Sequence, residues 1–387
     1  MNNVRKHICF FMKNYGFGGG VERVTSILAN DMVDRGYDVS IVSCVNGLSP
    51  RYDTNSHVHL YEIGIMPETS VNIPLSAKIP RMIRLPLALI NILLRPLLPL
   101  QTCRLQKKTK KLLKKIKPDV VISADLYFYP YLIPAQKKLG FKTIAHEHSC
   151  LSMPRGKNTQ KNHQLAIEYA DRVIVLTDSD LKDYREAFPG ADHILRIYDP
   201  STYEISDSIH PEHKVVMASG QCIHRKGFDM LIDAWNQIAD RVPDWELRIF
   251  GEGEEKENFQ NRIDRYGLKN ARMCGFSDHL RQEYEQASIF VFSSRFEGFG
   301  MVLSEAQAMG LACISFACKH GPSEIIDDGV NGFLVPPENV DALAEKLLLL
   351  MQNDDLRVAF SEKAQKDLYR FDIKTVGDAW ENLLESL

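Results

Sequence analysis

The sequence lacks the features that mark disulfide-linked, metal-binding and membrane-spanning proteins. Its eight cysteines form no Cys-x-x-Cys pair and do not combine with histidine at metal-ligand spacing, a pattern typical of reduced thiols in the cytosol. The longest apolar run, Leu85–Leu94, is too short to cross a bilayer and is bounded by Arg84 and Arg95. The first residues lead directly into an apolar strand pattern and have no signal-peptide shape. We therefore expect a cytoplasmic protein without an integral membrane segment.

Acidic residues are absent from one long segment of an otherwise slightly acidic chain. The net charge of the 387 residues is -3, so we expect no nucleic acid as a partner. Residues 78–117 nevertheless contain 12 Lys and Arg residues and no Asp or Glu. Apolar sequence with several prolines precedes a lysine-rich run at 107–117, a combination that binds anionic lipid. We therefore predict peripheral contact with an anionic membrane through residues 79–117; the alternative is a core helix with a solvated basic face.

Strand and helix patterns alternate along both halves of the chain. Such alternation predicts parallel sheets with helices on both faces, that is, an α/β protein with doubly wound domains. In the first half, strands are expected at 8–12, 39–42, 120–123, 143–145 and 173–176, with helices at 21–35, 105–115, 132–138 and 164–169. In the second half, strands are expected at 215–219, 246–250, 272–274, 289–292, 312–316 and 332–335, with helices at 227–239, 254–266 and 301–309.

The segment 198–211 has no periodicity and contains two prolines, which predicts a linker. We place one Rossmann-like domain at 1–198 and a second at 199–370. Ligands in doubly wound sheets bind beyond the carboxyl ends of the strands, so loops of both domains should face one cleft. Residues 371–387 exceed what a six-stranded unit needs. We expect this last helix to return to the first domain, with Trp380 as its anchor.

Two carboxylates eight positions apart, Glu297 and Glu305, flank a Gly-x-Gly turn. The strand pattern at 289–292 ends before Glu297, and the helix pattern that follows places Glu305 about one turn inside the helix. Gly298 and Gly300 allow backbone to approach a ligand closely, and the first amides of the helix face the same space. Such a site can bind phosphate on its amides and sugar hydroxyls on its carboxylates.

Glycines at positions 16 and 18–20 follow the first strand, where a dinucleotide-binding fingerprint would stand. Their spacing is wrong for that fingerprint, because position 21 is Val, and the second strand ends without a carboxylate for a ribose hydroxyl. NAD binding is therefore disfavoured. Two interpretations stay open: a tight turn with no further role, or a loop in which the amides of Gly19 and Gly20 touch a phosphate or an acceptor.

Basic and imidazole side chains follow other strands of the predicted sheets. Lys226, with Arg225 beside it, would neutralise a diphosphate, although an isolated Lys at a helix end is usually only solvated. Its place on the sheet edge that carries Glu297 favours the functional interpretation. His146 and His148 end a strand of the first domain and are candidates for handling a substrate. Metal ligation is not favoured, because no further ligand set with suitable spacing accompanies the two histidines.

Motifs along nearly the whole chain resemble the retaining, nucleotide-sugar-dependent enzymes of glycosyltransferase family 4, which have the GT-B fold of two Rossmann-like domains facing across a cleft. The Glu-x7-Glu motif, together with the preceding Lys-Gly, is highly specific in this context. The resemblance is carried by GGVERV at 19–24, KGFD at 226–229, FGEG at 250–253, EGFGMVL at 297–303 with EA at 305–306, GPSEII at 321–326 and the stretch 371–380.

The resemblance implies roles for the candidate residues. Glu305 would hold the ribose hydroxyls of the donor nucleotide. The catalytic group would comprise Glu297 on the donor sugar, Lys226 on the diphosphate and His148, or less favourably His146, near the reacting sugar. The family usually has Arg where this chain has Gln221, so Arg225 would compensate for the missing charge. The implied donor-binding set is Gly19, Gly20, Gln221, Arg225, Lys226, Gly251, Glu297, Gly298, Phe299, Gly300, Met301, Val302 and Glu305.

By resemblance, the reaction moves a hexose or N-acetylhexosamine from a nucleotide diphosphate sugar, expected to be a UDP-sugar, to a saccharide acceptor. Neither a metal nor another cofactor is expected, so Lys226 and helix-start amides would meet the charge of the leaving diphosphate. Retention could use a covalent intermediate or front-face attack, and the family leans to the second. Relatives of this type build surface polysaccharides on lipid-linked acceptors at the cytoplasmic face of the inner membrane, and we expect a peripheral location there.

Two other functions fit parts of the sequence. A nucleotide-sugar epimerase of the same two-domain architecture would release a free sugar or an epimer from the donor alone. A non-catalytic adaptor on the membrane surface would bind anionic vesicles through its basic segment without being protected by nucleotides. Product analysis and nucleotide-dependent stabilisation separate these alternatives from a glycosyltransferase.

Overall fold

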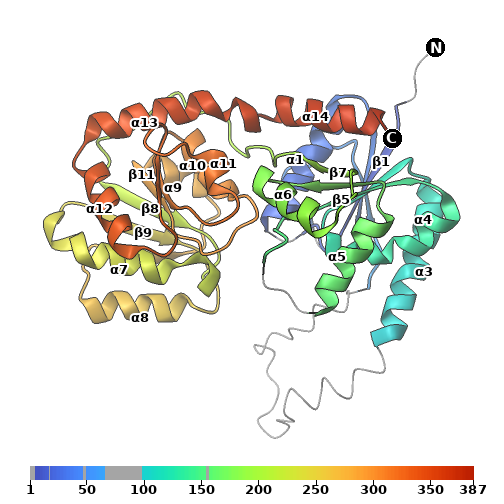
Figure 1. Cartoon of the computed structure of the whole chain (residues 1–387), viewed down its shortest axis with the longest axis horizontal. Coiled ribbons are helices and arrows are strands. Elements are labelled where there is room, and N and C mark those ends of the chain that lie inside the picture. Colours follow the sequence, from blue (N-terminus) through green and yellow to red (C-terminus); the bar gives the residue numbers. More distant parts are fainter. Residues whose placement is uncertain (1–4, 17, 47–48, 66–97, 154–156) are drawn as a thin grey trace, which may run out of the picture.

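The structure, a computed structural model, describes residues 5–16, 18–46, 49–65, 98–153 and 157–387. Two α/β domains lie side by side, and the C-terminal helices run along one edge from the second domain back to the first (Figure 1). Each domain is built on one sheet whose paired strands are all parallel. The doubly wound α/β fold expected from the sequence is thereby confirmed.

The first domain contains a seven-stranded sheet with the order β3-β2-β1-β4-β5-β6-β7. Its strands are β1 (His7–Met12), β2 (Asp38–Ser43), β3 (His59–Glu62), β4 (Val120–Ser123), β5 (Lys142–His146), β6 (Arg172–Val175) and β7 (Ile194–Arg196). Its helices are α1 (Gly20–Asp34), α3 (Leu98–Ile116), the 3-10 helix η3 (Leu126–Tyr131), α4 (Ile133–Leu139), α5 (Lys157–Tyr169) and α6 (Asp178–Ala187).

The second domain contains a six-stranded sheet with the order β10-β9-β8-β11-β12-β13. Its strands are β8 (Val215–Ser219), β9 (Glu246–Phe250), β10 (Ala271–Gly275), β11 (Ile289–Phe292), β12 (Ala312–Phe316) and β13 (Phe333–Val335). Its α-helices are α7 (Phe228–Ile238), α8 (Lys256–Tyr266), α9 (Leu280–Glu285), α10 (Met301–Ala308), α11 (Pro322–Ile325), α12 (Val340–Met351) and α13 (Asp354–Asp367). Short 3-10 helices lie at η4 (His224–Lys226), η5 (Ala239–Arg241) and η6 (Leu368–Phe371).

The central strand β1 separates two apolar cores in the first domain. Ile8 and Phe10 belong to the core that contains residues of α1, whereas Cys9 and Phe11 belong to the core that contains residues of α3, α4 and α5. Alternate residues of a strand point to opposite faces, so a strand covered on both faces needs apolar residues at every position. The continuous apolar run of β1 therefore explains why it lies in the middle of the sheet.

Several elements were not predicted from the sequence. The edge strand β3 has mostly exposed residues, so it carries no apolar pattern that would reveal it. Helix α6 is largely polar, but the side chain of Thr177 caps it by accepting a hydrogen bond from the amide of Asp180. The strand β7 and the helices α9 and α11 are three to six residues long, too short for a periodic signal.

The last helix, α14 (Ile373–Glu385), packs against α1 of the first domain. Trp380 on α14 is fully buried in the core that also contains Phe10 and Leu28. Arg35, which follows α1, donates hydrogen bonds of 2.8 Å to both Asp378 and Glu381. The C-terminal residues thus complete one face of the first domain.

Helix α3 carries the described part of the predicted membrane-contact segment; residues 79–97 lie outside the described residues. Leu105, Thr109 and Leu113, spaced four apart, are buried, which places one stripe of the helix against the domain. The other faces of this region expose Arg104, Lys107, Lys108, Lys110, Lys111, Lys114, Lys115 and Lys117. Among the described helices, none combines the length and apolar character that a membrane span requires.

Candidate functional site

Glu297 binds two cations at the carboxyl end of β11. Its Oε1 accepts hydrogen bonds from Lys226 Nζ at 2.6 Å and from Ser294 Oγ at 2.8 Å, and its Oε2 accepts one from Arg225 Nη1 at 3.0 Å. Burial alone would raise the pKa of Glu297, but Lys226 and Arg225 hold it below its usual value. The structure therefore brings together the three charged residues that the sequence placed on one sheet edge, with Glu297 ionised between both cations.

The Gly-x-Gly turn after Glu297 touches the first domain. A Cβ added to Gly298 would lie 2.5 Å from the backbone oxygen of His148 and 2.8 Å from Cα of Ser149, so only glycine fits there. Gly300 has a φ of 98°, a left-handed conformation that favours glycine, and it caps the start of α10. The loop that follows β5 and the loop that follows β11 are thus in direct contact. We call this region, where the two domains meet, the domain junction.

The N-terminal glycine loop reaches the same junction. Gly19 caps α1, and the Cα of Gly20 lies close enough to the second domain that an added Cβ would meet Met301 Sδ at 3.5 Å. The loop therefore faces the start of α10. The contact is ordinary van der Waals packing and leaves both interpretations of these glycines open.

Glu305, on α10, is buried and bonded to residues that the sequence did not single out. Its Oε1 accepts hydrogen bonds from Arg23 Nη1 at 2.7 Å and from Thr202 Oγ1 at 2.6 Å. Arg23 lies on α1 of the first domain, and Thr202 lies between the two domains in the chain. The hydroxyl of Tyr284 donates a longer bond of 3.4 Å to Oε2. Glu305 is therefore held from both sides of the domain junction.

His146 and His148 share one carboxylate. Asp199 Oδ2 lies 3.2 Å from His148 Nδ1, and Asp199 Oδ1 lies 3.5 Å from His146 Nε2. Burial would lower the pKa of His148, but the charge and hydrogen bond of Asp199, together with the charges of Asp125 and Glu147, outweigh burial and raise this pKa. Burial, with a smaller contribution from His148, holds the pKa of His146 well below its usual value. His148 is therefore the more basic member of the pair, and His146 is the less basic one.

The expectation that no third group accompanies the histidines was wrong. Asp199 is 51 residues from His148 in the sequence, so no local spacing could reveal it. Ligand-type atoms of His146, His148 and Asp199 lie within 4.8 Å of one another, a spacing that a metal ion would also accept. The hydrogen bond between His148 and Asp199 pairs the Nδ1 donor of the ring directly with a carboxylate oxygen. The arrangement is therefore also that of a histidine paired with a carboxylate.

Burial also distinguishes the two histidines. His146 is 2% exposed, and its ring packs edge-on against Trp380. The side chain of His148 is 9% exposed, and the backbone of His148 contacts the turn at Gly298. His148 Nε2 has no hydrogen-bond partner among the described residues. Of the two candidates, His148 is therefore the one placed to meet a ligand at the domain junction.

Other predicted donor-binding residues have different surroundings. The side chain of Phe299 is 3% exposed and packs against Tyr198 and Phe371, so only its backbone is available to a ligand. Gln221 is exposed. Gly251 packs against the backbone of Gly220, where a Cβ would clash, which gives this glycine a structural role. Met301 and Val302 are partly exposed at the start of α10.

Further hydrogen bonds join the domains beyond the predicted site. His320, after β12, is 2% exposed; its Nδ1 lies 2.8 Å from Ser179 Oγ and its Nε2 lies 3.1 Å from Ser152 Oγ. Glu324 accepts hydrogen bonds from the amide of Asp178 at 2.8 Å and from the hydroxyl of Tyr198 at 2.7 Å. The sequence reasoning did not identify these contacts, which hold the domains together beside the candidate site.

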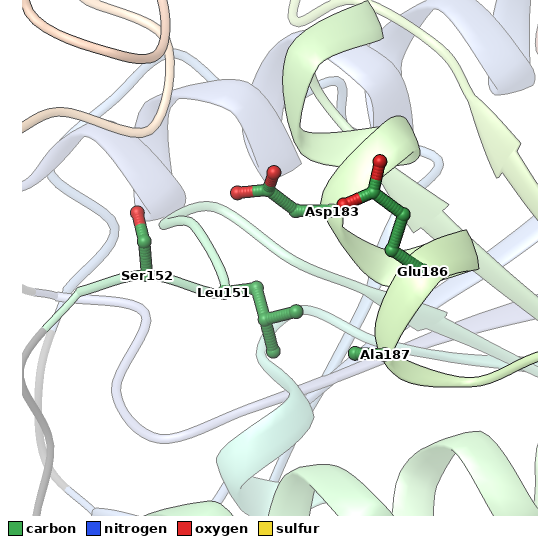
Figure 2. Close-up of a pocket in the computed structure, with 5 residues that line it drawn as sticks. All are labelled: Leu151, Ser152, Asp183, Glu186 and Ala187. Carbon is green, nitrogen blue, oxygen red and sulfur yellow. The ribbon is translucent and has the colours of Figure 1, made fainter.

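A surface depression of about 370 Å³ lies beside the domain junction. Leu151 and Ser152, on the loop that follows His148, form one wall, and α6 forms the other (Figure 2). Asp183, one of the α6 residues, also binds Lys319 Nζ of the second domain at 2.5 Å. The full lining is Leu151, Ser152, Asp183, Glu186 and Ala187. The depression is thus mildly acidic and contains a hydroxyl group.

Two family models match consecutive parts of the chain. "Glycosyltransferase Family 4" matches residues 18–199, and "Glycosyl transferases group 1" matches residues 203–367. The boundary between the two matches falls in the segment that joins β7 to β8. Together the two matches include Glu297, Glu305, Lys226 and both histidines.

Individual proteins resemble the chain over nearly its full length. An uncharacterized glycosyltransferase of Haemophilus influenzae is 26% identical, with 98% of this chain and 100% of the relative covered. The amylovoran biosynthesis glycosyltransferase AmsD of Erwinia amylovora is 24% identical, with 95% and 96% covered. Among solved structures, a mutant of S. aureus TarM in complex with Fondaparinux, alpha-GlcNAc-glycerol and UDP has a TM-score of 0.79 at 15% identity, with 98% and 99% covered. This structural likeness extends the agreement in fold to both domains.

Proposed function

The chain belongs to the glycosyltransferases of family 4 type, which have the GT-B fold, and we propose that it is a retaining enzyme that uses a UDP-sugar. The transferred group would be a hexose or an N-acetylhexosamine. The observation that carries this proposal is the pairing of Glu297 with Lys226 and Arg225, eight residues before Glu305. One carboxylate thus lies beside a site for negative charge, and the other lies on the helix whose start faces the same junction.

The donor would bind between the two domains. In this arrangement the ribose hydroxyls meet Glu305, and the diphosphate meets Lys226, Arg225 and the first amides of α10. The complex of TarM with UDP supports a uridine nucleotide as the donor's leaving group. Met301 at the start of α10 is next to Gly20, so the glycine loop of the first domain would cover the bound donor.

The chemistry of the leaving group follows from the charges at the junction. Departure of UDP develops negative charge on its diphosphate, and preorganised cations and amides stabilise such charge without a metal ion. Lys226 supplies an ammonium, and Arg225 supplies the second positive charge that Gln221 cannot provide. Contact between Gly298 and the His148 backbone closes the site on one side, which would limit hydrolysis of the donor by water.

His148 would act on the donor sugar. It is charge-paired with Asp199 through Nδ1, and its Nε2 is free of partners among the described residues. A protonated imidazole donates a hydrogen bond from Nε2, so His148 would orient a sugar hydroxyl close to the reacting carbon. Glu297 would bind the donor sugar from the opposite domain.

The acceptor would be a saccharide that approaches along the first domain. The depression lined by Leu151 and α6 offers Asp183, Glu186 and a hydroxyl, which suit sugar hydroxyls (Figure 2). The names of AmsD and of the TarM complex support a saccharide acceptor in bacterial surface polysaccharide synthesis. We further propose that this acceptor is lipid-linked and that the enzyme contacts the cytoplasmic face of the inner membrane through its basic α3. The exposed lysines of α3 support this location.

Nucleotide-dependent stabilisation tests the donor assignment. UDP should raise the unfolding temperature of the purified protein more than GDP or ADP does, because binding to the native state alone stabilises it. Glu305→Ala should abolish the UDP effect, whereas Glu285→Ala, at an exposed site on α9, should keep it. Absence of a shift with all three nucleotides would count against the glycosyltransferase proposal.

Product analysis tests the reaction class. A glycosyltransferase consumes a UDP-sugar at a rate that depends on a saccharide acceptor, and the anomeric configuration of the product establishes retention. Release of an epimer or a free sugar from the donor alone would favour a nucleotide-sugar epimerase. Nucleotide binding without any turnover on a broad acceptor panel would contradict the catalytic part of the proposal.

A further inference from the structure

Arg23 forms an ion pair with Glu305, and it comes from the other domain. The guanidinium Nη1 donates a 2.7 Å hydrogen bond to Glu305 Oε1, and the carboxylate is 2% exposed. The Arg23 side chain is 25% exposed, and its guanidinium carbon lies 5.0 Å from the ring centroid of Tyr52 and 5.8 Å from that of Tyr203. Stacking on two rings holds the guanidinium in one place. Arg23 therefore forms a preorganised bridge between the domains.

The two oxygens of Glu305 have different surroundings. Oε1 accepts both short hydrogen bonds, from Arg23 and from Thr202 Oγ1. Oε2 has only the long bond from Tyr284 among the described residues. A carboxylate oxygen has two lone pairs, so Oε2 retains the capacity to accept hydrogen bonds from a ligand. Arg23 and Thr202 thus fix the rotation of the carboxylate by binding Oε1. Oε2 is then the oxygen that can accept hydrogen bonds from a ligand.

A nucleotide that reaches Glu305 meets this ion pair, and two outcomes are conceivable. The ribose could displace Arg23, or it could bind while Arg23 stays. Ribose hydroxyls are neutral, so displacement would leave a buried carboxylate without a countercharge, which is strongly unfavourable. If Arg23 stays, the negative charge of Glu305 remains compensated, and Oε2 of Glu305 is available to the ribose.

We propose that Arg23 is a positioning residue of the nucleotide site: it stays on Glu305 when the nucleotide binds and couples binding to the approach of the two domains. This inference rests on the proposed role of Glu305 in holding the ribose. Because Arg23 belongs to the first domain, the oriented carboxylate exists only when the domains are together. Binding and closure then favour each other, since coupling between two equilibria is reciprocal.

Isothermal titration of the full chain with UDP tests the proposal. Arg23→Gln should weaken UDP binding about tenfold or more, and Arg23→Lys, which keeps the charge, should restore part of the loss. The matched control is Arg51→Gln, because Arg51 also pairs across the domains, with Asp278, but both side chains are exposed. This control should change UDP affinity less than about twofold.

Two further measurements distinguish positioning from a merely structural role. In the Glu305→Gln background, Arg23→Gln should cause no additional loss of UDP affinity, because the bridge is already broken. Small-angle scattering should show UDP-dependent compaction in the wild type and a smaller effect in Arg23→Gln. If Arg23→Gln does not fold, Arg23→Lys alone should still bind UDP more weakly than the wild type.

The outcomes separate this inference from the proposed function. Unchanged or tighter UDP binding by both Arg23 variants would overturn the proposal that Arg23 stays on Glu305. It would indicate that the nucleotide displaces Arg23 or binds independently of it. If the wild type itself binds no UDP, the nucleotide assignment fails and the inference fails with it. Wild-type binding that is lost in Glu305→Ala but unaffected in Arg23→Gln would preserve the proposed function and reject only the inference.

Discussion

The Nδ1–H of His148 donates a hydrogen bond to Asp199, a residue that is 51 positions away in the chain and 2% exposed. This pair crosses from the loop after β5 to the start of the segment between the domains. The opposite oxygen of Asp199 lies near His146, whose ring centroid is 4.0 Å from that of His148. Asp199 thus raises the pKa of His148, whereas burial and His148 lower the pKa of His146; Glu22, Asp125 and Glu147 are further acidic groups that interact with His148.

Asp199→Asn should lower the pKa of His148 below its usual value, because burial would then act without the opposing carboxylate. In the wild type, protonated His148 stabilises the fold, and this contribution is fully present at pH values below the pKa of an unfolded histidine. It is lost as the pH rises through the raised pKa of His148 in the folded protein. The variant should lack this contribution. NMR titration of the imidazole signals, assigned with His148→Asn, measures the change directly.

The control for that titration is Asp207→Asn, an exposed carboxylate in the same inter-domain segment. It should leave the His148 signal at its wild-type titration midpoint. An Asp199→Asn protein whose His148 midpoint is unchanged would show that other groups, such as Asp125 or Glu147, set the charge of the ring. The pH dependence of turnover should shift to lower pH with the His148 midpoint if the protonated ring is the active form.

Glu297→Gln should reduce turnover by about 10²-fold while weakening UDP binding much less. The amide keeps the size of the side chain but cannot pair with both Lys226 and Arg225, so the cations and the donor sugar lose their common partner. Steady-state kinetics and UDP titration measure the two effects separately. Glu285→Gln, at an exposed carboxylate on α9, is the control, and an unaltered turnover number in Glu297→Gln would remove this residue from the site.

Gly298→Ala should separate the two domains. The added methyl group would overlap the backbone at His148 and Ser149, and neither contact is a flexible side-chain end that could move aside. Small-angle scattering should therefore report a larger radius of gyration. Gly20→Ala is the control for this measurement, because its methyl group would meet only Met301 Sδ at 3.5 Å; identical scattering of both variants would contradict a tight contact at Gly298.

Charge reversal on α3 should release the protein from anionic vesicles. The four substitutions to Glu are at Lys107, Lys108, Lys110 and Lys111. Each cation near such a surface contributes about 1 kcal/mol of binding free energy, so the four changes together should abolish co-sedimentation with phosphatidylglycerol vesicles. The control reverses Lys182, Lys269 and Lys366, which are exposed lysines on other elements. Vesicle binding that survives the α3 reversal would leave the basic face of this helix merely solvated.

Trp380→Ala should destabilise the first domain by about 3–5 kcal/mol, because it removes a large, fully buried side chain and leaves a cavity. Chemical denaturation followed by a probe in the first domain measures the loss. Leu349→Ala, at a leucine that is 40% exposed on α12, should change stability by less than about 0.5 kcal/mol. Equal effects of the two substitutions would show that α14 contributes little to the first domain.

The sequence predicted the second sheet well because its strands are buried on both faces. Buried parallel strands form short, continuous apolar runs between polar turns, and β8, β9, β11 and β12 begin and end at the predicted residues. Edge strand β3 and polar helix α6 lack such runs, since exposure relaxes the need for apolar residues. Their positions follow from pairing with β2 and from the Thr177 cap, which only the three-dimensional structure reveals.

The site was predicted in part. Glu297, Lys226 and Arg225 could be placed together because all three follow strands of one parallel sheet, where carboxyl ends share an edge. Arg23, Thr202 and Asp199 could not, because their contacts span 282, 103 and 51 residues and depend on how the domains meet. The only sequence signal for Arg23 was its place in the GGVERV motif, directly after the glycine loop. Charged residues that pair across the domain junction leave no local pattern in the sequence.

The packing of α14 on α1 has a consequence for how the protein is made. The chain emerges from the ribosome from its N-terminus, yet the core around Phe10 and Leu28 needs Trp380, which is synthesised after the second domain. The first domain therefore stays incomplete until the whole second domain has been translated. A premature stop within the last helix would leave the donor-binding residues intact and disable the protein through the opposite domain.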